Sequence, residues 1–332
     1  MFYSLLIVTG MVINMRYIAD STDFKFKNSA ITLGKFDGLH LGHQYLMDQV
    51  ISYKELGYTA IMFSFLYHPQ NLFSDKEFQL IYTEEEKVNK LRKSGIDALI
   101  SYPFTEETKN MEAEAFIKNI LVDKLDTRII VVGNDFRFGH NRRGDYHMLQ
   151  TFEKEYNYKV IVCDKKTWNN TVISSSTIRN ELKAGNIETV NAMLGTPYSI
   201  TGEVLHGRKI GRTIGMPTTN IMPSSNKLLP PCGVYASKTI VKGQAFPGIT
   251  NIGFKPTVGA EESKGVETFI FDYDEDLYGE QIEVQLYAFE RPEIKFNTLE
   301  ELREAMLEDI EFGRRYFNLA PAKKIKKLFT RK

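Results

Sequence analysis

Two histidines stand three residues apart in a glycine-rich segment near the start of the chain, at His40 and His43. This spacing places both imidazoles on one face of a first helical turn, where unpaired backbone N–H groups and the helix dipole favour an anion. Glycines let a ligand approach the backbone closely. The pattern therefore predicts a phosphate-binding turn in which two imidazoles donate hydrogen bonds to developing charge. The other residues assigned to it are Gly34, Phe36, Asp37, Gly38 and Gly42.

The histidine segment lacks the glycine–lysine–hydroxyl ending of a Walker loop, so it is not a P-loop of that kind. A glycine-rich turn carrying two surface histidines is the alternative structural interpretation. The paired histidines, combined with three glycines at Gly34, Gly38 and Gly42, favour the functional interpretation.

A second glycine-rich segment, at residues 207–220, is cationic. Its arginines and lysine suit a polyphosphate, and a plain surface loop is the alternative. Thr218 and Asn220 supply hard oxygen ligands of the kind that Mg²⁺ prefers beside substrate phosphates. The phosphate-binding residues predicted here are Gly207, Gly211, Arg212, Gly215, Thr218 and Asn220.

The first half of the chain alternates short apolar runs with amphipathic ones. The apolar runs predict strands at 30–33, 60–65, 98–102, 128–132 and 159–163. Helices are expected at 44–54, 83–93, 112–124 and 145–155. Thr83 and Glu86 form a capping-box pattern at the start of the second of these helices. Regular alternation of strand and helix predicts a doubly wound parallel sheet of the α/β class, with ligands beyond the carboxyl ends of its strands.

The second half of the chain has a different composition, richer in Gly and Pro. Short β-branched and aromatic runs predict antiparallel strands at 199–205, 234–241, 266–273 and 282–289. Residues 299–317 predict one amphipathic helix, and 176–194 predict helices between the two halves. We therefore expect two domains, residues 15–186 and residues 187–332. The second is a small antiparallel β-barrel with a terminal helix.

Composition limits the partners. The chain has 332 residues, with 42 Lys plus Arg and 42 Asp plus Glu, so its formal charge is zero. A nucleic-acid binder usually shows a basic excess, and none is expected here. Residues 2–13 are mostly apolar, but they are too short to span a bilayer. They also lack the charged region of a signal peptide, because no Lys or Arg precedes Arg16. Met15 is an alternative start. We expect a cytoplasmic protein with no membrane partner; the sequence leaves the oligomeric state open, a homo-oligomer included.

The histidine segment resembles the H-x-G-H signature of nucleotidyltransferases, and its longer form resembles the FMN adenylyltransferase domain of prokaryotic FAD synthetases. Further matching blocks follow in order: His68-Pro69, Val132–Gly139 with Asp135 and Arg137, and Ile173–Arg179 with Ser175, Ser176 and Arg179. Ser176 stands where that family usually has Thr, and the hydroxyl is kept. The resemblance implies that these residues bind ATP. Two serines at a helix start and an arginine one turn later also suit a triphosphate.

The second segment resembles the riboflavin kinase signature Gly-x-Pro-Thr-x-Asn, here Gly215 to Asn220, with Thr219 where Ala is usual. Residues 231–236, 251–257 and 266–279 are also similar to that family. The resemblance implies that Glu267 is the acidic base. Together, the two resemblances cover the chain from about Ile31 to Tyr316.

Together these resemblances imply a bifunctional riboflavin kinase and FMN adenylyltransferase that uses ATP and Mg²⁺, with riboflavin and FMN as substrates. An FMN phosphate is already anionic at neutral pH and needs no general base, whereas a ribityl hydroxyl does. Two alternatives stay open: a nucleotidyltransferase with another phosphate acceptor, and a non-catalytic regulator that binds flavin or nucleic acid.

Overall fold

The computed structural model describes residues 15–66, 79–206, 215–255 and 263–321. The chain divides into two compact units, Met1–Ser174 and Ser175–Lys332. The predicted boundary between residues 186 and 187 stays a prediction. Residues 1–14, His68-Pro69, and the predicted loop residues Gly207, Gly211 and Arg212 lie outside the described residues.

The first unit is built on a parallel sheet of six strands in the order β1-β4-β3-β2-β5-β8. Its strands are β1 Arg16–Ala19, β2 Ser29–Leu33, β3 Thr59–Leu66, β4 Ala98–Pro103, β5 Thr127–Gly133 and β8 Lys159–Cys163. The five predicted strands are confirmed. The short edge strand β1 was not predicted. Two small hairpins, β6 Arg137–Phe138 with β7 Gly144–Asp145 and β9 Thr167–Trp168 with β10 Thr171–Val172, complete the unit.

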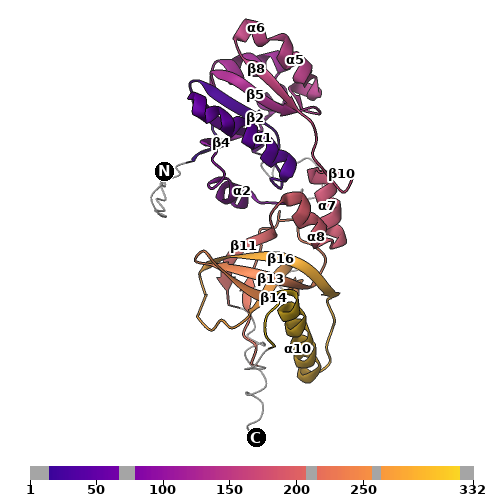
Figure 1. Ribbon diagram of the computed structural model, residues 1–332. Coiled ribbons are helices and arrows are strands. Elements are labelled where there is room, and N and C mark those ends of the chain that lie inside the picture. Colours follow the sequence, from indigo (N-terminus) through magenta and orange to yellow (C-terminus); the bar gives the residue numbers. More distant parts are fainter. Residues whose placement is uncertain (1–14, 67–78, 207–214, 256–262, 322–332) are drawn as a thin grey trace. The chain divides into compact units, whose positions relative to one another are not determined.

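Helices cover both faces of this sheet (Figure 1). On one face, α1 Leu41–Ser52 and α2 Glu84–Leu91 pack with alternate strand residues such as Ala60, Met62 and Leu99. The other face is covered by α4 Ala113–Phe116, its π-helical continuation Ile117–Val122 and α5 Tyr146–Thr151. These helices pack with the strand residues that alternate with the first set and point to this second face. The remaining helical segments are Tyr53–Leu56, α3 Glu106–Lys109, His140–Arg142 and α6 Glu153–Tyr156. This doubly wound arrangement confirms the predicted fold.

The strand order creates a switch point between β2 and β5. The chain leaves β2 toward β3 on one side, whereas β5 pairs with the other side of β2. Ligands of doubly wound sheets bind where the order reverses, beyond the carboxyl ends of these strands. The histidine segment follows β2 and the Gly133–Asp135 segment follows β5. The fold therefore places two predicted motifs at its switch point.

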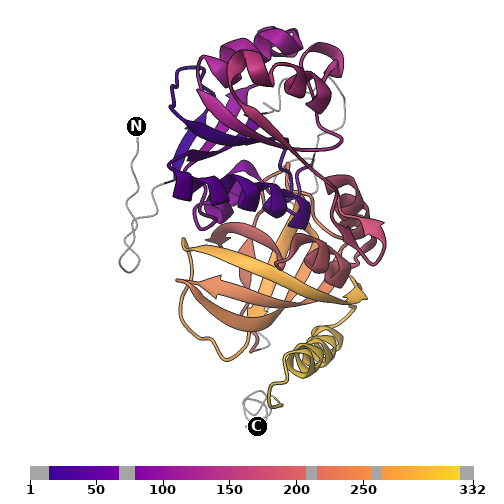
Figure 2. The same cartoon turned by 45° about the horizontal axis from the view of Figure 1, so that its top comes forward.

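The second unit contains a closed antiparallel barrel in the order β11-β12-β15-β14-β13-β16 (Figure 2). Its strands are β11 Tyr198–Leu205, β12 Thr219–Ile221, β13 Gly233–Val241, β14 Gln244–Lys255, β15 Ser263–Ile270 and β16 Gln281–Pro292. Helices α7 Ser175–Ala184 and α8 Ile187–Leu194 precede it. The predicted barrel is confirmed; β12 and β14 were not among the predicted strands.

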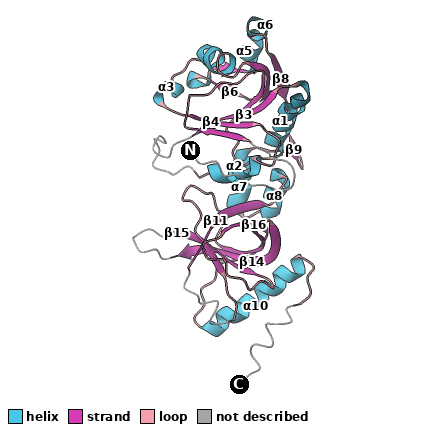
Figure 3. Ribbon diagram, turned by 90° about the vertical axis from the view of Figure 1, so that its left-hand side faces the viewer, coloured by secondary structure: helices cyan, strands magenta, loops and turns pink. Residues whose placement is uncertain are grey.

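Helix α10, Leu299–Tyr316, confirms the predicted terminal helix and lies beside β14 on the outside of the barrel (Figure 3). Two ion pairs hold it. Arg291 of β16 binds Asp309 through two 2.7 Å hydrogen bonds, and Arg314 binds Asp272 at 2.8 and 2.9 Å. Among the described residues, no helix is long and apolar enough to cross a membrane.

Candidate active sites

His40 and His43 form a stacked pair at the start of α1. His40 is the N-cap residue, and its Nδ1 accepts a hydrogen bond of 3.3 Å from the backbone N–H of His43. The two rings stack with centroids 3.6 Å apart and planes inclined by 16°. A Cβ on Gly42 would lie 3.2 Å from His40 Nδ1, so glycine gives this ring room to fold back over the helix start. The structure thus brings the two predicted catalytic imidazoles together.

Both imidazoles are neutral at pH 7 in the ligand-free protein. Burial lowers the pKa of His40 to about 4. Burial, followed by the charges of His40 and Lys87, lowers the pKa of His43 well below its ordinary value. Because His40 Nδ1 accepts a hydrogen bond, its single proton must reside on Nε2. His40 is therefore a neutral donor with a fixed tautomer.

The buried histidine predicts that the first unit loses stability in mild acid. Between pH 6.5 and about 4, the unfolded chain binds a proton at His40 that the folded chain does not, so stability falls as the pH falls. Between pH 7 and 5 this residue should cost about 2 kcal/mol. Urea unfolding followed through Trp168, the single tryptophan, measures the loss. His40→Asn keeps a capping oxygen and should be less pH-sensitive by that amount; equal pH sensitivity in both proteins would contradict the assignment.

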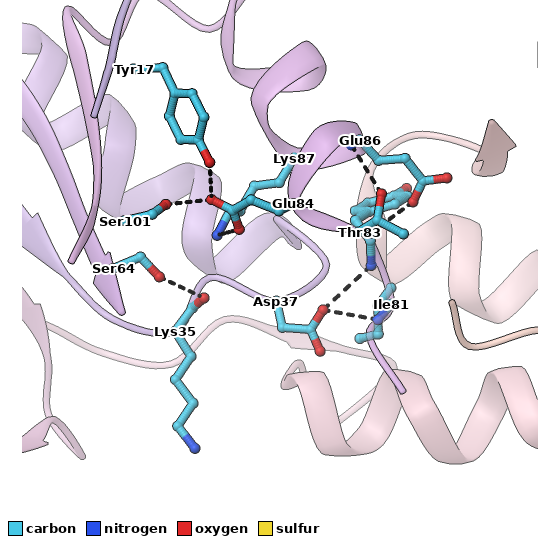
Figure 4. A network of polar contacts seen from close by, with 11 residues as sticks. Tyr17, Lys35, Asp37, Ser64, Ile81, Thr83, Glu84, Glu86, Lys87 and Ser101 are labelled. Atoms are coloured by element: carbon cyan, nitrogen blue, oxygen red, sulfur yellow. Dashed lines mark hydrogen bonds and ion pairs between the residues drawn. The ribbon is translucent and has the colours of Figure 1, made fainter. Parts of the chain in front are cut away.

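The rest of the predicted phosphate turn supports the pair. Phe36 is fully buried, has a positive φ of 49° and packs edge-on against His43 at 5.1 Å. Asp37 accepts hydrogen bonds from the backbone N–H groups of Ile81 at 2.9 Å and Tyr82 at 3.4 Å (Figure 4). It thereby ties the turn to the segment that leads into α2. Direct binding of ATP by Phe36 or Asp37 stays a prediction.

Glycines shape the two ends of this turn. Gly38 has a φ of +90°, and a Cβ there would meet Ile81 Cδ1 at 3.0 Å. A Cβ on Gly34 would meet the Phe36 ring at 3.1 Å. Packing inside the turn therefore favours glycine at both positions, whether or not a ligand approaches the backbone there.

Asp135 and Arg137 follow β5 at the switch point and are exposed. Asp135 pairs with Lys165 at 2.8 Å, and Arg137 pairs with Asp145 at 2.6 Å. The neighbouring Asn134 donates to Asp164 at 3.1 Å. Exposed ion pairs contribute little to stability and exchange partners readily. Asp135 and Arg137 can therefore exchange these ion pairs for the predicted ATP contacts.

Ser175, Ser176 and Arg179 belong to the second unit and begin α7. Ser175 opens the helix, Ser176 is exposed and Arg179 lies one turn further. This confirms that the serines stand at a helix start. Their role in binding a triphosphate stays a prediction.

The barrel carries the second group of predicted residues on two adjacent strands, β12 and β15, and in the segment that leads into β12. Thr218 donates a hydrogen bond of 2.5 Å to Oε1 of Glu267. Asn220 of β12 is the cross-strand partner of Glu267 of β15, so their side chains point to the same side of the sheet. Gly215, with a φ of +75°, precedes this group in an exposed turn. The structure thus brings Thr218, Asn220 and Glu267 together.

Sequence reasoning gave no role to Asn251, which the fold adds to this group. Asn251 of β14 pairs with Glu267 from the other side, so Asn220, Glu267 and Asn251 form one row across three strands. The alternate residues Thr268 and Thr250 are buried and share a 2.8 Å hydrogen bond. The row of amides and carboxylate therefore lies on the outward face. Asn251 begins one of the similar blocks, but only the strand register reveals its neighbour.

These oxygens fit a magnesium ion that is shared with a substrate. Thr218, Asn220 and Glu267 offer hydroxyl, amide and carboxylate oxygens, which are hard ligands. In the described part of the chain, no cluster of three or more His, Cys, Asp or Glu side chains could hold a metal by itself. Mg²⁺ commonly uses one or two protein ligands and completes its shell with phosphates and water. The donor set matches that mode.

Comparisons with known proteins agree with this arrangement. A family model described as FAD synthetase matches residues 23–177, and one described as riboflavin kinase matches residues 194–317. The chain is 38% identical over 297 residues to the bifunctional riboflavin kinase/FMN adenylyltransferase of Buchnera aphidicola subsp. Schizaphis graminum, covering 88% of this chain and 95% of that protein. It is 36% identical to the enzyme of the same name from Bacillus subtilis, covering 87% and 93%.

A solved structure has a similar fold over nearly the whole chain. It is the crystal structure titled macrolide-efflux protein from Streptococcus pneumoniae, with a TM-score of 0.80 and 26% identity, covering 90% of this chain and 98% of that one. Both matched family models and the identities over nearly full length lead to one conclusion. The chain belongs to the family of bifunctional riboflavin kinase/FMN adenylyltransferases.

Proposed function

We propose that this chain phosphorylates riboflavin to FMN in its barrel and adenylylates FMN to FAD in its N-terminal unit, using ATP in both steps. The observation that carries this proposal is the chemical difference between the two sites. One site presents neutral imidazole donors at a helix start, and the other presents a carboxylate beside magnesium-type oxygens. The first chemistry suits a nucleophile that is already ionised, and the second suits an alcohol.

In adenylyl transfer, a phosphate oxygen of FMN attacks the α-phosphorus of ATP. A new oxygen–phosphorus bond forms, the bond to the β-phosphate oxygen breaks, and pyrophosphate leaves. The nucleophile needs no base, so the protein must position the phosphates and stabilise charge. His40 would do this through its Nε2–H, with His43 stacked against it. The start of α1 adds backbone N–H groups and the helix dipole.

In the kinase step, the terminal ribityl hydroxyl attacks the γ-phosphorus of ATP and releases ADP. The hydroxyl must lose its proton, and Glu267 is the proposed acceptor. Thr218 donates to Oε1 and thereby orients the carboxylate, leaving Oε2 to receive the substrate proton. Asn251 and Asn220 flank the carboxylate on the same face. Asp272 is unsuited to replace it, because Arg314 binds both of its oxygens.

Magnesium is part of the proposal as the partner of ATP. Thr218 and Asn220 would hold it next to the phosphates. When bound, Mg²⁺ would offset phosphate charge. A cytoplasmic location is also proposed, supported by Cys163 and Cys232, which are both free thiols.

One incubation tests the function. The protein is mixed with riboflavin and Mg·ATP, and products are separated by chromatography over time. FMN should appear first and FAD after it, and excess EDTA should abolish both. Absence of FMN would contradict the kinase assignment. FMN without FAD, also when FMN is supplied directly, would contradict the adenylyltransferase assignment.

A further inference from the structure

Four residues on the inner face of the barrel, Ser237, Thr250, Thr268 and Thr219, form a hydrogen-bonded hydroxyl row. The first three are buried, where apolar side chains are usual. Thr250 donates a hydrogen bond of 2.8 Å to Ser237, and its hydroxyl oxygen lies 2.8 Å from that of Thr268. Because Thr250 has a single proton and gives it to Ser237, Thr268 must be the donor to Thr250. Thr219 extends the row by donating to the backbone carbonyl oxygen of Thr268 at 3.3 Å.

The hydroxyl row stands directly behind residues proposed for the kinase step. Thr268 follows Glu267 in β15, and Thr250 precedes Asn251 in β14. Adjacent residues of a strand point to opposite faces, so the row lies on the inner face of the strands whose outer face carries Glu267 and Asn251. The two threonines are cross-strand partners, and so are the two outer residues. A hydrogen bond that fixes β14 against β15 on the inner face therefore also fixes the spacing of the outer pair.

The short strand β12 is held to β15 on both of its faces. It has three residues, Thr219–Ile221, and so offers few backbone hydrogen bonds. On the outer side Thr218 donates to the carboxylate of Glu267, and on the inner side Thr219 donates to the carbonyl oxygen of Thr268. Thr219 stands where the riboflavin kinase signature usually has Ala, which could not form the inner bond. One link of the hydroxyl row thus depends on a residue in which this chain departs from that signature.

We propose that the hydroxyl row positions Glu267 for riboflavin phosphorylation, by fixing the backbone of β15 on the side opposite the carboxylate. The inference rests on the proposed kinase function and adds positioning residues to it. Valine has nearly the shape of threonine, and replacing both partners of a buried hydrogen bond by apolar groups of the same shape can be neutral for stability. A row that served stability alone would therefore need no hydroxyls. Fully paired, directional hydrogen bonds instead specify one alignment of the strands.

The first test changes the row at the residue next to Glu267. Thr268→Val should lower kcat for riboflavin phosphorylation by roughly tenfold and leave the KM for riboflavin nearly unchanged, because a slightly misplaced base weakens proton transfer rather than binding. Thr268→Ser keeps the hydroxyl and should retain most of the activity. The matched control is Thr239→Val on β13. In the described part of the chain the buried Thr239 hydroxyl has no hydrogen-bond partner, so its removal should leave kcat unchanged.

The second test separates positioning from general damage to the barrel. Thr268→Val is combined with Glu267→Gln, and the residual kinase activity is compared with that of Glu267→Gln alone. If the row acts through the carboxylate, the added valine should cause little further loss, because two changes that act on one group are not additive. Damage that does not involve Glu267 would lower the residual activity by the same roughly tenfold factor as in the wild-type protein.

Three results would overturn the proposal: unchanged kcat in Thr268→Val, equal impairment in Thr268→Ser, or an undiminished valine effect beside Glu267→Gln. If Thr268→Val does not fold, Ser237→Ala/Thr250→Val/Thr268→Val provides the same comparison, because it removes all three buried hydroxyls of the row together and leaves none of them unpaired. A wild-type protein that makes no FMN would instead contradict the proposed function, so the two failures are distinguishable.

Discussion

Glu267→Gln is expected to reduce riboflavin phosphorylation by roughly 10²- to 10⁴-fold, the range typical of a lost general base. Glutamine retains the oxygen to which Thr218 donates, but it places an amide nitrogen, which cannot accept a proton, in the other position. FAD formation from supplied FMN should be nearly unchanged, because that nucleophile is already ionised. Product analysis with riboflavin and with FMN as separate substrates measures both steps.

The matched control is Glu283→Gln on β16. This residue also sits on a barrel strand, but β16 pairs with β11 and β13, away from the β12, β15 and β14 row. Both activities should persist in it. The melting temperature of Glu267→Gln should barely change, because the substitution preserves shape. Normal kinase activity in Glu267→Gln would show that this carboxylate is not the base, and unfolding would show that it serves mainly in structure.

His43→Ala is expected to impair FAD formation and to spare riboflavin phosphorylation, the reverse of Glu267→Gln. FAD formation from FMN should fall by roughly 10²- to 10³-fold, as when a preorganised donor to developing charge is removed. The change also removes the ring against which His40 stacks and leaves Phe36 without its edge contact. Riboflavin phosphorylation should persist, since Thr218, Asn220 and Glu267 belong to the other unit.

His147→Ala is the control for this variant, because it makes the same change at an exposed position of the same unit. It should leave FAD formation intact. Trp168 fluorescence reports whether the unit that carries His43 is folded in His43→Ala, and the surviving kinase activity reports on the other unit. Equal loss of both activities in His43→Ala would mean that the residue supports the whole structure or that the two reactions share one site.

The sequence predicted the parts of the fold that depend on local pattern. Strong apolar runs gave five strands of the sheet, and the Thr83–Glu86 box correctly marked the start of α2, where both hydrogen bonds of the box are present. The strand β1 was missed because it is a short edge strand, and three of its four residues are exposed rather than part of a buried apolar run. The strand β14 was missed because Pro247, Gly248 and Gly253 interrupt its pattern, although the barrel still pairs it along its length.

The candidate sites were predictable in residue type but not in detailed role. Spacing placed His40 and His43 together, yet the stacking and the fixed tautomer depend on cap geometry that spacing does not specify. Asp37 suggested a phosphate contact, but its hydrogen-bond partners lie more than 40 residues away at Ile81 and Tyr82. Asn251 was given no role because only the strand register brings it beside Glu267. Long-range packing decides such roles.

The central claim, two chemically distinct sites in one chain, is tested most directly by complementation. His43→Ala and Glu267→Gln are incubated with riboflavin and Mg·ATP, each alone and then mixed, and FAD is measured. Each variant alone should make little FAD from riboflavin: the first stops at FMN, and the second forms almost none. The mixture should make FAD at a substantial rate, because FMN released by one protein is adenylylated by the other. A mixture that makes no more FAD than the variants alone would contradict two separate sites linked by free FMN.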